Sequence, residues 1–343
     1  MKLVIDCLGG DQSPGANIDG SLRALDRYPD LELVLCGDEE AISAYLAQKG
    51  TPEARARISL VHAPGVITGD DKPTDAIRLK KDSSMMSAIR LLREDETVSG
   101  IVSTGATGSL IAAATLRIGR IPGVIRPAFC PILPTMDGGV VGLCDSGANV
   151  DCSPQQLVQF AIMASAYMKV NFGKESPRVA LLNVGTEAEK GDELRRETYK
   201  ILSQLPFINF VGNMESRDFI SGKYDLVVAD DFSGNVLVKS TEGTALQLLK
   251  KIKRDIYSRN VYKLGALFMK KMFEEEKEFM NYQNYGGSVL LGTEKVIVKG
   301  HGSSDEAAVF ACIRQAYTMA TANLRDIICA EIERAEGFME NIG

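Results

Sequence analysis

The sequence has no CxxC pair, and its seven cysteines are an odd number in a chain of 343 residues. Most of them lie inside apolar runs, as Cys36 does in LELVLC. Paired, evenly counted cysteines are typical of disulfide frameworks, and clustered ones are typical of metal sites. The pattern here instead predicts reduced thiols that pack as small buried hydrophobes, with no metal site.

Excess positive charge and long hydrophobic runs are also missing. The formal net charge is -6, which argues against general nucleic-acid binding, because that requires a broad basic face. Apolar stretches such as SLIAAATL are far shorter than the roughly 18 to 20 residues of a membrane span. The N-terminal MKLVIDCLGGD begins as a strand and lacks signal-peptide features. We therefore expect a cytoplasmic protein.

Short apolar runs alternate with amphipathic stretches along the chain. Examples of the runs are KLVIDC, LELVLC, ISLVHA, GGVVGLCD, RVALLNV, YDLVVAD and KVIVKG. Strands that are apolar on both faces are typical of a mostly parallel sheet covered by helices on both sides. The sequence therefore predicts an α/β fold with a doubly wound, mostly parallel sheet in three α/β/α layers. Ligands of such folds bind beyond the carboxyl ends of the strands.

Several of the predicted strand ends share one design, in which glycine and small polar residues lead into a helix. The five clearest cases are DCLGGDQSPG, VSTGATGS, CDSGANVDCSP, NVGTEAEKG and DDFSGNVLVKS. Glycine lets backbone N–H groups converge on an anion, and the N-terminus of the following helix adds partial positive charge. One such turn is weak evidence, since every α/β fold needs glycine at its corners. Five of them together favour a phosphate-binding site.

Residues 1 to about 322 carry a series of motifs in the order found in one enzyme family. Besides the five turns, the motifs are DKPTDAIRLKKDSSM at 71–85, GRIPGVIRPA, LPTMDGG, GNMESRD and VKGHGSSD at 298–305. In these motifs the chain resembles the PlsX-type phosphate acyltransferases. It departs from their usual pattern at Gln12, where they carry histidine, and at Ala106, where they carry asparagine. These two positions are given no essential role.

The resemblance implies a fold similar to that of isocitrate and isopropylmalate dehydrogenases. It also implies formation of acyl phosphate from an acyl-[acyl-carrier-protein] thioester and inorganic phosphate, at the start of phospholipid synthesis. We expect a homodimer without a cofactor, at the inner face of the cell membrane. A membrane-embedded glycerol-3-phosphate acyltransferase is the expected consumer of the product.

The chemistry of this reaction suits a chain with only 2 histidines. Phosphate is already a charged nucleophile near neutral pH, and a thiol leaving group has a pKa of about 8.5. The reaction needs a holder for phosphate, donors for the oxyanion and alignment of two substrates, but no strong base. No cysteine stands beside an activating base in sequence. We therefore expect direct attack of phosphate on the thioester, with no acyl-enzyme.

Three residues are the candidate catalytic groups. His301 follows a strand and is placed to donate to the thioester oxygen or to phosphate, or else to hold a turn. Lys190 follows NVGTEAE, where its ammonium can reach an anion or remain solvated. Asn183 ends a strand and can orient phosphate or cap a helix. The expected substrate-binding residues are Gly9, Gly10, Asp11, Ser103, Gly105, Thr107, Gly108, Asn149, Asn213, Asn235, Ser303 and Ser304.

Two basic regions stand out in this acidic chain. Arg78, Lys80 and Lys81 are expected to contact phosphate or the acidic carrier protein, although a plain helix face is the alternative. Residues 250–271 carry eight basic residues against one acidic residue, with Leu264, Leu267 and Phe268 between them. We expect this segment to contact a membrane, or alternatively the acyl chain or a partner subunit.

For the domain organisation, we expect one α/β domain over residues 1–322. A helical excursion of two helices is expected at about 245–283, with a possible bend at Gly265, and a helical extension at 323–343. Three other functions stay open at this point. They are a phosphotransacetylase-like enzyme that uses acyl-coenzyme A, an NAD-dependent decarboxylating dehydrogenase, and a noncatalytic scaffold docked on a membrane. The dehydrogenase lacks support because the sequence has no G-x-G-x-x-G.

Overall fold

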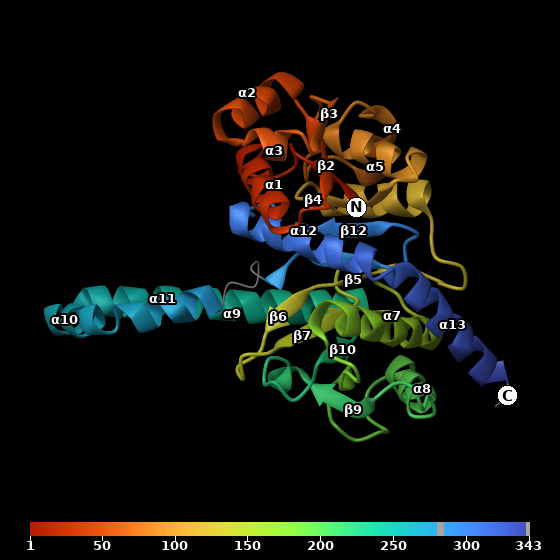
Figure 1. Ribbon diagram of the computed structural model, residues 1–343. Helices are drawn as coiled ribbons and strands as arrows, with labels where there is room; N and C mark the ends of the chain where they lie inside the picture. Colours follow the sequence, from red (N-terminus) through yellow and green to blue (C-terminus); the bar gives the residue numbers. More distant parts are fainter. Residues whose placement is uncertain (280–284, 341–343) are drawn as a thin grey trace.

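The computed structural model describes residues 1–279 and 285–340, and it contains two sheets (Figure 1). The first has seven strands in the order β3-β2-β1-β4-β12-β11-β5. Their bounds are Ile58–His62, Glu32–Gly37, Lys2–Asp6, Val98–Ser103, Val296–Lys299, Ser288–Leu291 and Ala128–Cys130. The strands from β3 to β12 run parallel, whereas β11 pairs antiparallel with β12 and β5.

The second sheet has five strands in the order β6-β7-β10-β8-β9. Their bounds are Ile132–Pro134, Val140–Cys144, Leu226–Val228, Val179–Asn183 and Phe210–Glu215. We expected one doubly wound sheet, and this was wrong because the structure has two sheets. Both are mostly parallel, as expected. The chain passes from one sheet to the other at Pro131, between β5 and β6. Proline lacks the N–H that would continue a ladder, so it suits a point where a strand ends.

Helices cover both faces of the first sheet, as the apolar runs predicted. On one face lie α1 (Gly15–Arg27) and α12 (Glu306–Thr321), with α2 (Glu39–Lys49) and α3 (Pro52–Arg55) beside α1. On the other lie α4 (Pro73–Leu79), α5 (Ser84–Glu94) and α6 (Thr107–Ala113), which continues as a π-helix, η1 (Ala114–Ile118). Leu3 and Ile5 of β1 belong to one buried cluster and Val4 to another, because successive strand residues point to opposite faces.

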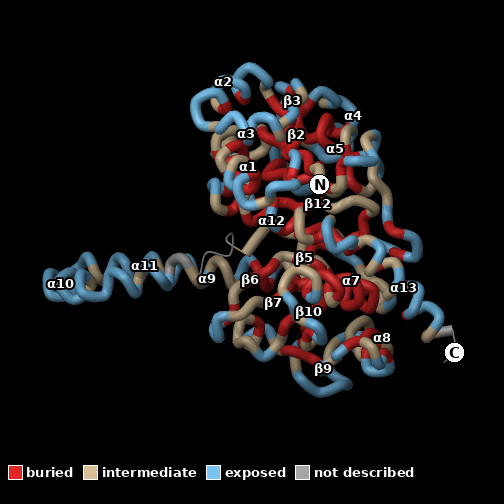
Figure 2. The backbone as a smooth tube through the Cα atoms, viewed as in Figure 1, coloured by how far each residue is buried: buried red, intermediate tan, exposed pale blue. Residues whose placement is uncertain are grey.

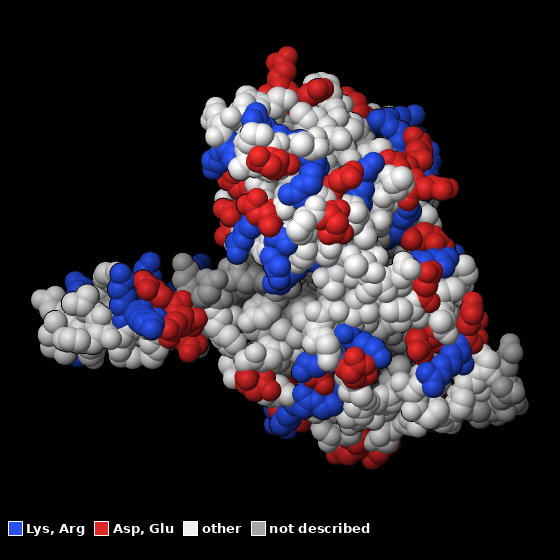
Figure 3. All heavy atoms as spheres, viewed as in Figure 1, with Lys and Arg blue, Asp and Glu red and all other residues white. Residues whose placement is uncertain are grey.

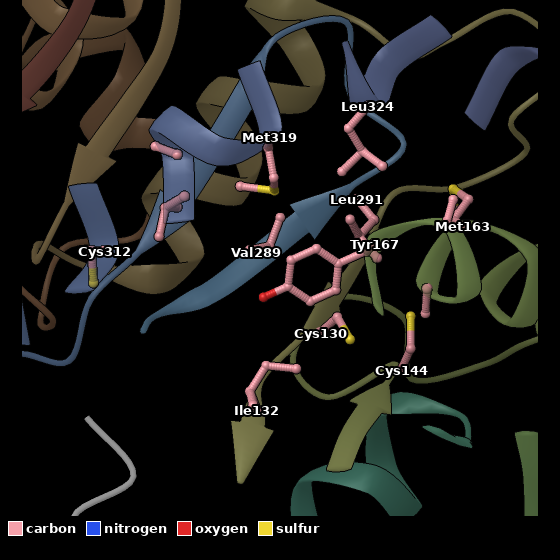
Figure 4. Close-up of a cluster of buried hydrophobic side chains, with 14 of the residues drawn as sticks. Cys130, Ile132, Cys144, Met163, Tyr167, Val289, Leu291, Cys312, Met319 and Leu324 are labelled. Carbon is pink, nitrogen blue, oxygen red and sulfur yellow. The ribbon is translucent and has the colours of Figure 1, made fainter. Parts of the chain in front are cut away.

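Three further helices belong to the second sheet and its junction with the first. They are α7 (Pro154–Phe172), α8 (Glu193–Leu202) and α13 (Leu324–Glu340), and a short 3₁₀ turn, η2, spans Ser216–Asp218. The α7 helix packs on α13, α12 and α8. Its Tyr167 is fully buried among Cys130, Val289 and Met319, in the core that joins the two halves (Figure 4). This core fixes the two sheets relative to each other.

A long helical arm projects from the body. It consists of α9 (Asp231–Ser258), α10 (Asn260–Phe268) and α11 (Lys270–Phe279). Figures 1 and 2 show the outer part of the arm extending into solvent, with exposed residues over α10 and α11. In the described residues, no helix is long and apolar enough to span a bilayer.

Candidate active site

A cavity of about 430 Å³ lies where segments of both sheets meet. Its walls come from the start of α6, the β5–β6 segment, the turn after β7, α9, and the β12–α12 turn. Five of the residues expected to bind substrate or catalyse the reaction line it. They are Thr107, Gly108, Asn235, His301 and Ser304.

The turns that follow β1, β4 and β12 pack directly on one another, because these parallel strands are neighbours in the sheet. A Cβ on Gly9 would lie 2.3 Å from the Cα of Gly105. One on Gly10 would lie 2.7 Å from the Oγ1 of Thr104. The backbone N–H of Asp11 donates to the carbonyl of Gly302 at 2.7 Å. These glycines and Asp11 therefore shape the floor next to the cavity and do not belong to its lining.

The buried carboxylate of Asp6 ties three of the sequence motifs together. It accepts hydrogen bonds from the hydroxyls of Ser84 and Ser103, at 2.5 and 2.6 Å. Ser103 in turn accepts from the backbone N–H of Gly105 at 3.1 Å. Ser103 is completely buried, so it holds the β4–α6 turn in place and is not open to substrate.

Lys299, at the end of β12, lines the cavity and was missed by the sequence reasoning. It is only 8% exposed. Its ammonium donates to the carbonyls of Thr104, at 3.4 Å, and Gly300. Burial lowers the pKa of Lys299 to about 8, while the nearby Cys312 and Asp6 act in the opposite direction. A lysine that closes the apolar run VIVK was the signal available in the sequence.

His301 is held in a defined tautomer. Its Nδ1 accepts the backbone N–H of Ser303 at 3.2 Å and lies 2.8 Å from the Ser303 hydroxyl. A backbone N–H can only donate, so the ring proton of neutral His301 is on Nε2. Burial lowers the pKa of His301, and the charges of Lys299 and Lys239 add to the effect. His301 is therefore a neutral donor through Nε2 near pH 7.

Asn149 does not reach the cavity. Its amide donates to the Asp145 carboxyl at 2.7 Å and to the carbonyl of Pro127 at 2.8 Å. Burial raises the pKa of Asp145 to about 7, although hydrogen bonds from Asn149 and the Phe129 N–H oppose the rise. Together Asp145 and Asn149 fix the turn whose Ser146 and Gly147 do line the cavity.

Lys190, Asn183 and Asn213 form a separate group at the ends of β8 and β9. The Asn183 amide donates to the Lys190 carbonyl at 3.0 Å, and that of Asn213 donates to the Glu187 carbonyl at 2.7 Å. The Lys190 residue is exposed and lies outside the lining of the cavity.

Arg195 links the start of α8, just after Lys190, to the start of α9. Its guanidinium contacts Asp192 at 2.7 Å, and also contacts Asp230 and Ser233 at the start of α9, the helix that carries Asn235. The group of Lys190, Asn183 and Asn213 and the α9 wall of the cavity therefore lie at the same edge of the second sheet.

The three basic residues Arg78, Lys80 and Lys81 differ in their ion pairs. Arg78 pairs with Asp75 at 3.6 Å, and Lys80 pairs with Asp71 at 2.6 Å while donating to the Val66 carbonyl. Lys81 is exposed, and in residues 1–279 and 285–340 no ion pair to it is found. None of the three lines the cavity.

The arm carries the expected apolar tip. Leu264, Leu267 and Phe268 all lie on α10 and are exposed, Phe268 by 84%. Figure 3 shows an uncharged tip, then basic side chains and then acidic ones closer to the body.

The helices of the arm differ in their bounds from the expected pair of helices. The arm begins as α9 at Asp231, and its breaks fall at Arg259 and Met269, whereas Gly265 lies within α10. Residues 280–283 of the expected excursion, and 341–343 of the expected extension, lie outside the described residues.

The two positions that depart from the family pattern, Gln12 and Ala106, both lie in turns that follow strands of the first sheet. Gln12 is exposed in the turn after β1. Ala106 stands at the N-cap of α6 and provides no side-chain hydrogen bond there. Over the described parts of the chain, no group of three or more His, Cys, Asp or Glu residues is arranged to hold a metal ion.

The two mostly parallel sheets and their connections define the class of fold. The chain superposes on a phosphotransacetylase from Streptococcus pyogenes with a TM-score of 0.60, covering 94% of each chain, at 14% sequence identity. Sequence comparison then gives the family. The family model described as "Fatty acid synthesis protein" matches residues 1–326, so the chain belongs to this family.

Two curated relatives carry the name "Phosphate acyltransferase". The relative from Halalkalibacterium halodurans is 41% identical over 343 residues, which is 100% of both chains. That from Bacillus subtilis is 42% identical over 333 residues, covering 97% of this chain and 98% of the relative. These likenesses confirm the resemblance to PlsX-type phosphate acyltransferases and support an acyl transfer to phosphate.

Proposed function

We propose that this protein transfers the acyl group of an acyl-[acyl-carrier-protein] to inorganic phosphate, releasing the carrier protein and supplying acyl phosphate for phospholipid synthesis. The observation that carries the proposal is the cavity in which the buried ammonium of Lys299 lies near His301. A fixed positive charge in a poorly solvated site attracts a multiply charged anion more strongly than the same charge in water.

In the proposed reaction, a phosphate oxygen attacks the thioester carbonyl carbon. The new C–O bond forms, the C–S bond breaks, and the sulfur leaves as a thiolate that takes a proton from solvent. Lys299 balances the charge of phosphate, and the Nε2–H of His301 donates to the oxyanion. Thr107, Asn235 and Ser304 supply further polar groups from the cavity wall.

The cavity contains no activated cysteine in its described lining. Cys312 lines it, but burial raises the pKa of this thiol to about 12. A thiol is a weak nucleophile until it loses its proton. This supports direct attack by phosphate. Mass spectrometry of the protein after incubation with acyl-carrier protein, without phosphate, should show no added acyl group.

Lys190, Asn183 and Asn213 enter the proposal as a second group, at the same strand edge as the cavity. Parallel strands lie about 4.8 Å apart, and β8 is two places from β7, so the group stands on the order of 10 Å along the edge. We propose that Lys190 contacts the phosphopantetheine chain of the incoming donor, or the phosphate of that chain. Unchanged kinetics of Lys190→Ala would remove it from the site.

The main alternative donor is acyl-coenzyme A, because the S. pyogenes protein of similar fold is named a phosphotransacetylase. The deciding experiment compares equal concentrations of acyl-carrier protein and acyl-coenzyme A with labelled phosphate, and measures labelled acyl phosphate. The proposal requires a higher kcat/KM with the carrier protein. A preference for coenzyme A would overturn the choice of donor.

We also propose a cytoplasmic homodimer that associates peripherally with the inner face of the membrane, passing its product to a membrane-embedded glycerol-3-phosphate acyltransferase. The exposed apolar tip of the arm supports the membrane contact. The implied relation to the isocitrate and isopropylmalate dehydrogenase fold is part of the same proposal. Light scattering tests the dimer, and a fully active monomer at micromolar concentration would contradict it.

A further inference from the structure

A basic groove lies on the first sheet's α4–α5 face, away from the lining of the central cavity. It has a volume of about 220 Å³, and its lining comes from α4, α5, η1 and the link after α4. The lining residues are Ile77, Lys81, Met86, Ile89, Arg90, Arg93 and Arg117. Four of them are cationic and none is acidic, in a chain whose net charge is -6. The groove is therefore a local reversal of charge.

The cations of the groove are largely unneutralised. Arg93 pairs with the exposed Glu94 at 2.6 Å. No ion pair to Lys81, Arg90 or Arg117 occurs within the described ranges, and all three are exposed. Four like charges gathered in one groove repel one another, so an unoccupied groove is electrostatically unfavourable. An anionic partner would relieve this repulsion.

The floor of the groove is apolar. Ile77, Met86 and Ile89 are buried beneath the basic side chains. Two large hydrophobic residues of the same elements are exposed, Leu79 on α4 by 70% and Leu116 on η1 by 66%. Apolar surface surrounded by one sign of charge suits an amphipathic helix of the opposite charge better than a small free anion.

One continuous helical segment contributes residues to both the groove and the cavity. Thr107 lines the cavity at the start of α6, and Arg117 lines the groove on η1, which continues α6 without a break. The ten residue steps between them span at most about 15 Å, because the α-helical rise is about 1.5 Å per residue and the rise in the π-helix η1 is smaller. A phosphopantetheine arm is comparable to about five extended peptide units, roughly 17 Å. A carrier protein seated at the groove can therefore place its thioester in the cavity.

We propose that the groove around Lys81, Arg90, Arg93 and Arg117 is the docking site of the acyl carrier protein, which binds through an acidic amphipathic helix. This inference rests on the proposed function for the identity of the partner. It assigns recognition to the α5–η1 groove, and leaves Arg78 and Lys80 to their pairs with Asp75 and Asp71. Recognition by charge predicts that the affinity falls as salt rises.

The test uses the full chain with Arg90→Glu and Arg117→Glu combined. The matched control combines Arg27→Glu and Arg55→Glu, which reverse the charge of two exposed arginines of α1 and α3 on the opposite face of the sheet. Fluorescence anisotropy measures binding of labelled holo-acyl carrier protein. Acyl phosphate formation is measured with acyl-carrier protein, with acyl-coenzyme A and with acyl-pantetheine, the last of which has no protein part.

We expect the groove variant to bind the carrier protein about tenfold or more weakly than wild type. Its KM for acyl-carrier protein should rise by a similar factor, whereas its kinetics with acyl-pantetheine stay unchanged and the control behaves as wild type. Unchanged binding, or an equal loss in the control, would overturn the proposal. So would a loss confined to acyl-coenzyme A, which would identify a site for nucleotide phosphates. Absence of acyl phosphate with every donor would refute the proposed function, while the binding measurement would still decide the docking site.

Discussion

At the scale of single residues, Lys299 distinguishes this site from an ordinary glycine-rich turn. Its ammonium is held by two backbone carbonyls at the end of a buried strand, close to the Asp6 carboxylate. Burial disfavours the charged form, and the pKa falls to about 8. The amine is therefore still mostly charged at neutral pH and is placed to attract phosphate.

Replacing Lys299 by methionine, which is similar in length and uncharged, should lower kcat/KM for phosphate by about 100-fold. The melting temperature should fall only moderately, because removing the buried charge also removes its desolvation cost, which offsets part of the loss of its hydrogen bonds to Thr104 and Gly300. Lys295→Met is the matched control, since Lys295 bonds backbone carbonyls of Glu96 and Val98 but lies outside the cavity. Equal losses in both variants would show that the effect is not specific to the site.

The activity of the wild type should depend on pH through the protonation of Lys299. As pH rises through about 8, the folded amine loses its charge, so the KM for phosphate should increase. The unfolded amine keeps its proton to about 10.4, so the folded state binds fewer protons between these values, and stability should rise with pH there. A KM for phosphate that is flat from pH 7 to 9 would argue against contact between Lys299 and phosphate.

The sequence supported several site residues because strand-end turns are recognisable by composition. Thr107, Gly108, Asn235, His301 and Ser304 were chosen in this way, and all five line the cavity. The sequence could not distinguish Asn149, whose amide hydrogen-bonds to Asp145 and Pro127, from an asparagine that is open to ligand. Which way a side chain points depends on contacts that are distant in sequence, here 22 residues for Pro127.

At the scale of elements, the arm is the feature whose function is easiest to separate from the cavity. Its α10 tip exposes Leu264, Leu267 and Phe268, and the basic residues of 250–271 flank the tip. Basic side chains near an anionic surface contribute about 1 kcal/mol each, and buried apolar side chains add the hydrophobic term. The two contributions together support the proposed reversible membrane binding.

We predict that wild type sediments with vesicles containing anionic lipid, and that the variant with Leu267→Glu and Phe268→Glu does not. The matched control combines Met136→Glu and Val211→Glu, which alter two exposed apolar residues of the body, and it should sediment like wild type. Equal sedimentation of the tip variant and wild type, or no sedimentation of wild type, would refute membrane docking by the arm.

The limits of the arm show why element boundaries were harder to predict than its existence. The stretch DDFSGNVLVKS contains glycine and small polar residues, which suggested a turn. In the structure, Asp230 caps α9 by accepting the N–H of Ser233 at 3.0 Å, and the helix runs on to Ser258. Glycine is needed at position 234 because the helix passes close to Asp145. A Cβ on Gly234 would lie 2.1 Å from the Asp145 carbonyl oxygen. Packing therefore decided what local propensity could not.

At the scale of the whole molecule, alternating apolar runs predicted an α/β fold, and the fold comparison bears this out. The division into two sheets was not predictable from the runs, since strands of both sheets are equally apolar. It depends on which strands pair, and β12 joins β4 across nearly 200 residues of sequence. This long-range pairing also brings Lys299 and His301 to the turns after β1 and β4, and so assembles the cavity.

The central claim is that phosphate itself attacks a thioester on the carrier protein. Its most direct test is incubation of the protein with acyl-carrier protein and phosphate labelled with ¹⁸O at all four oxygens, followed by mass spectrometry of the product. The account predicts acyl phosphate that retains all four labelled oxygens, with one free carrier thiol released per molecule formed. Release of the thiol without labelled acyl phosphate, or acyl phosphate formed only when coenzyme A is added, would contradict it.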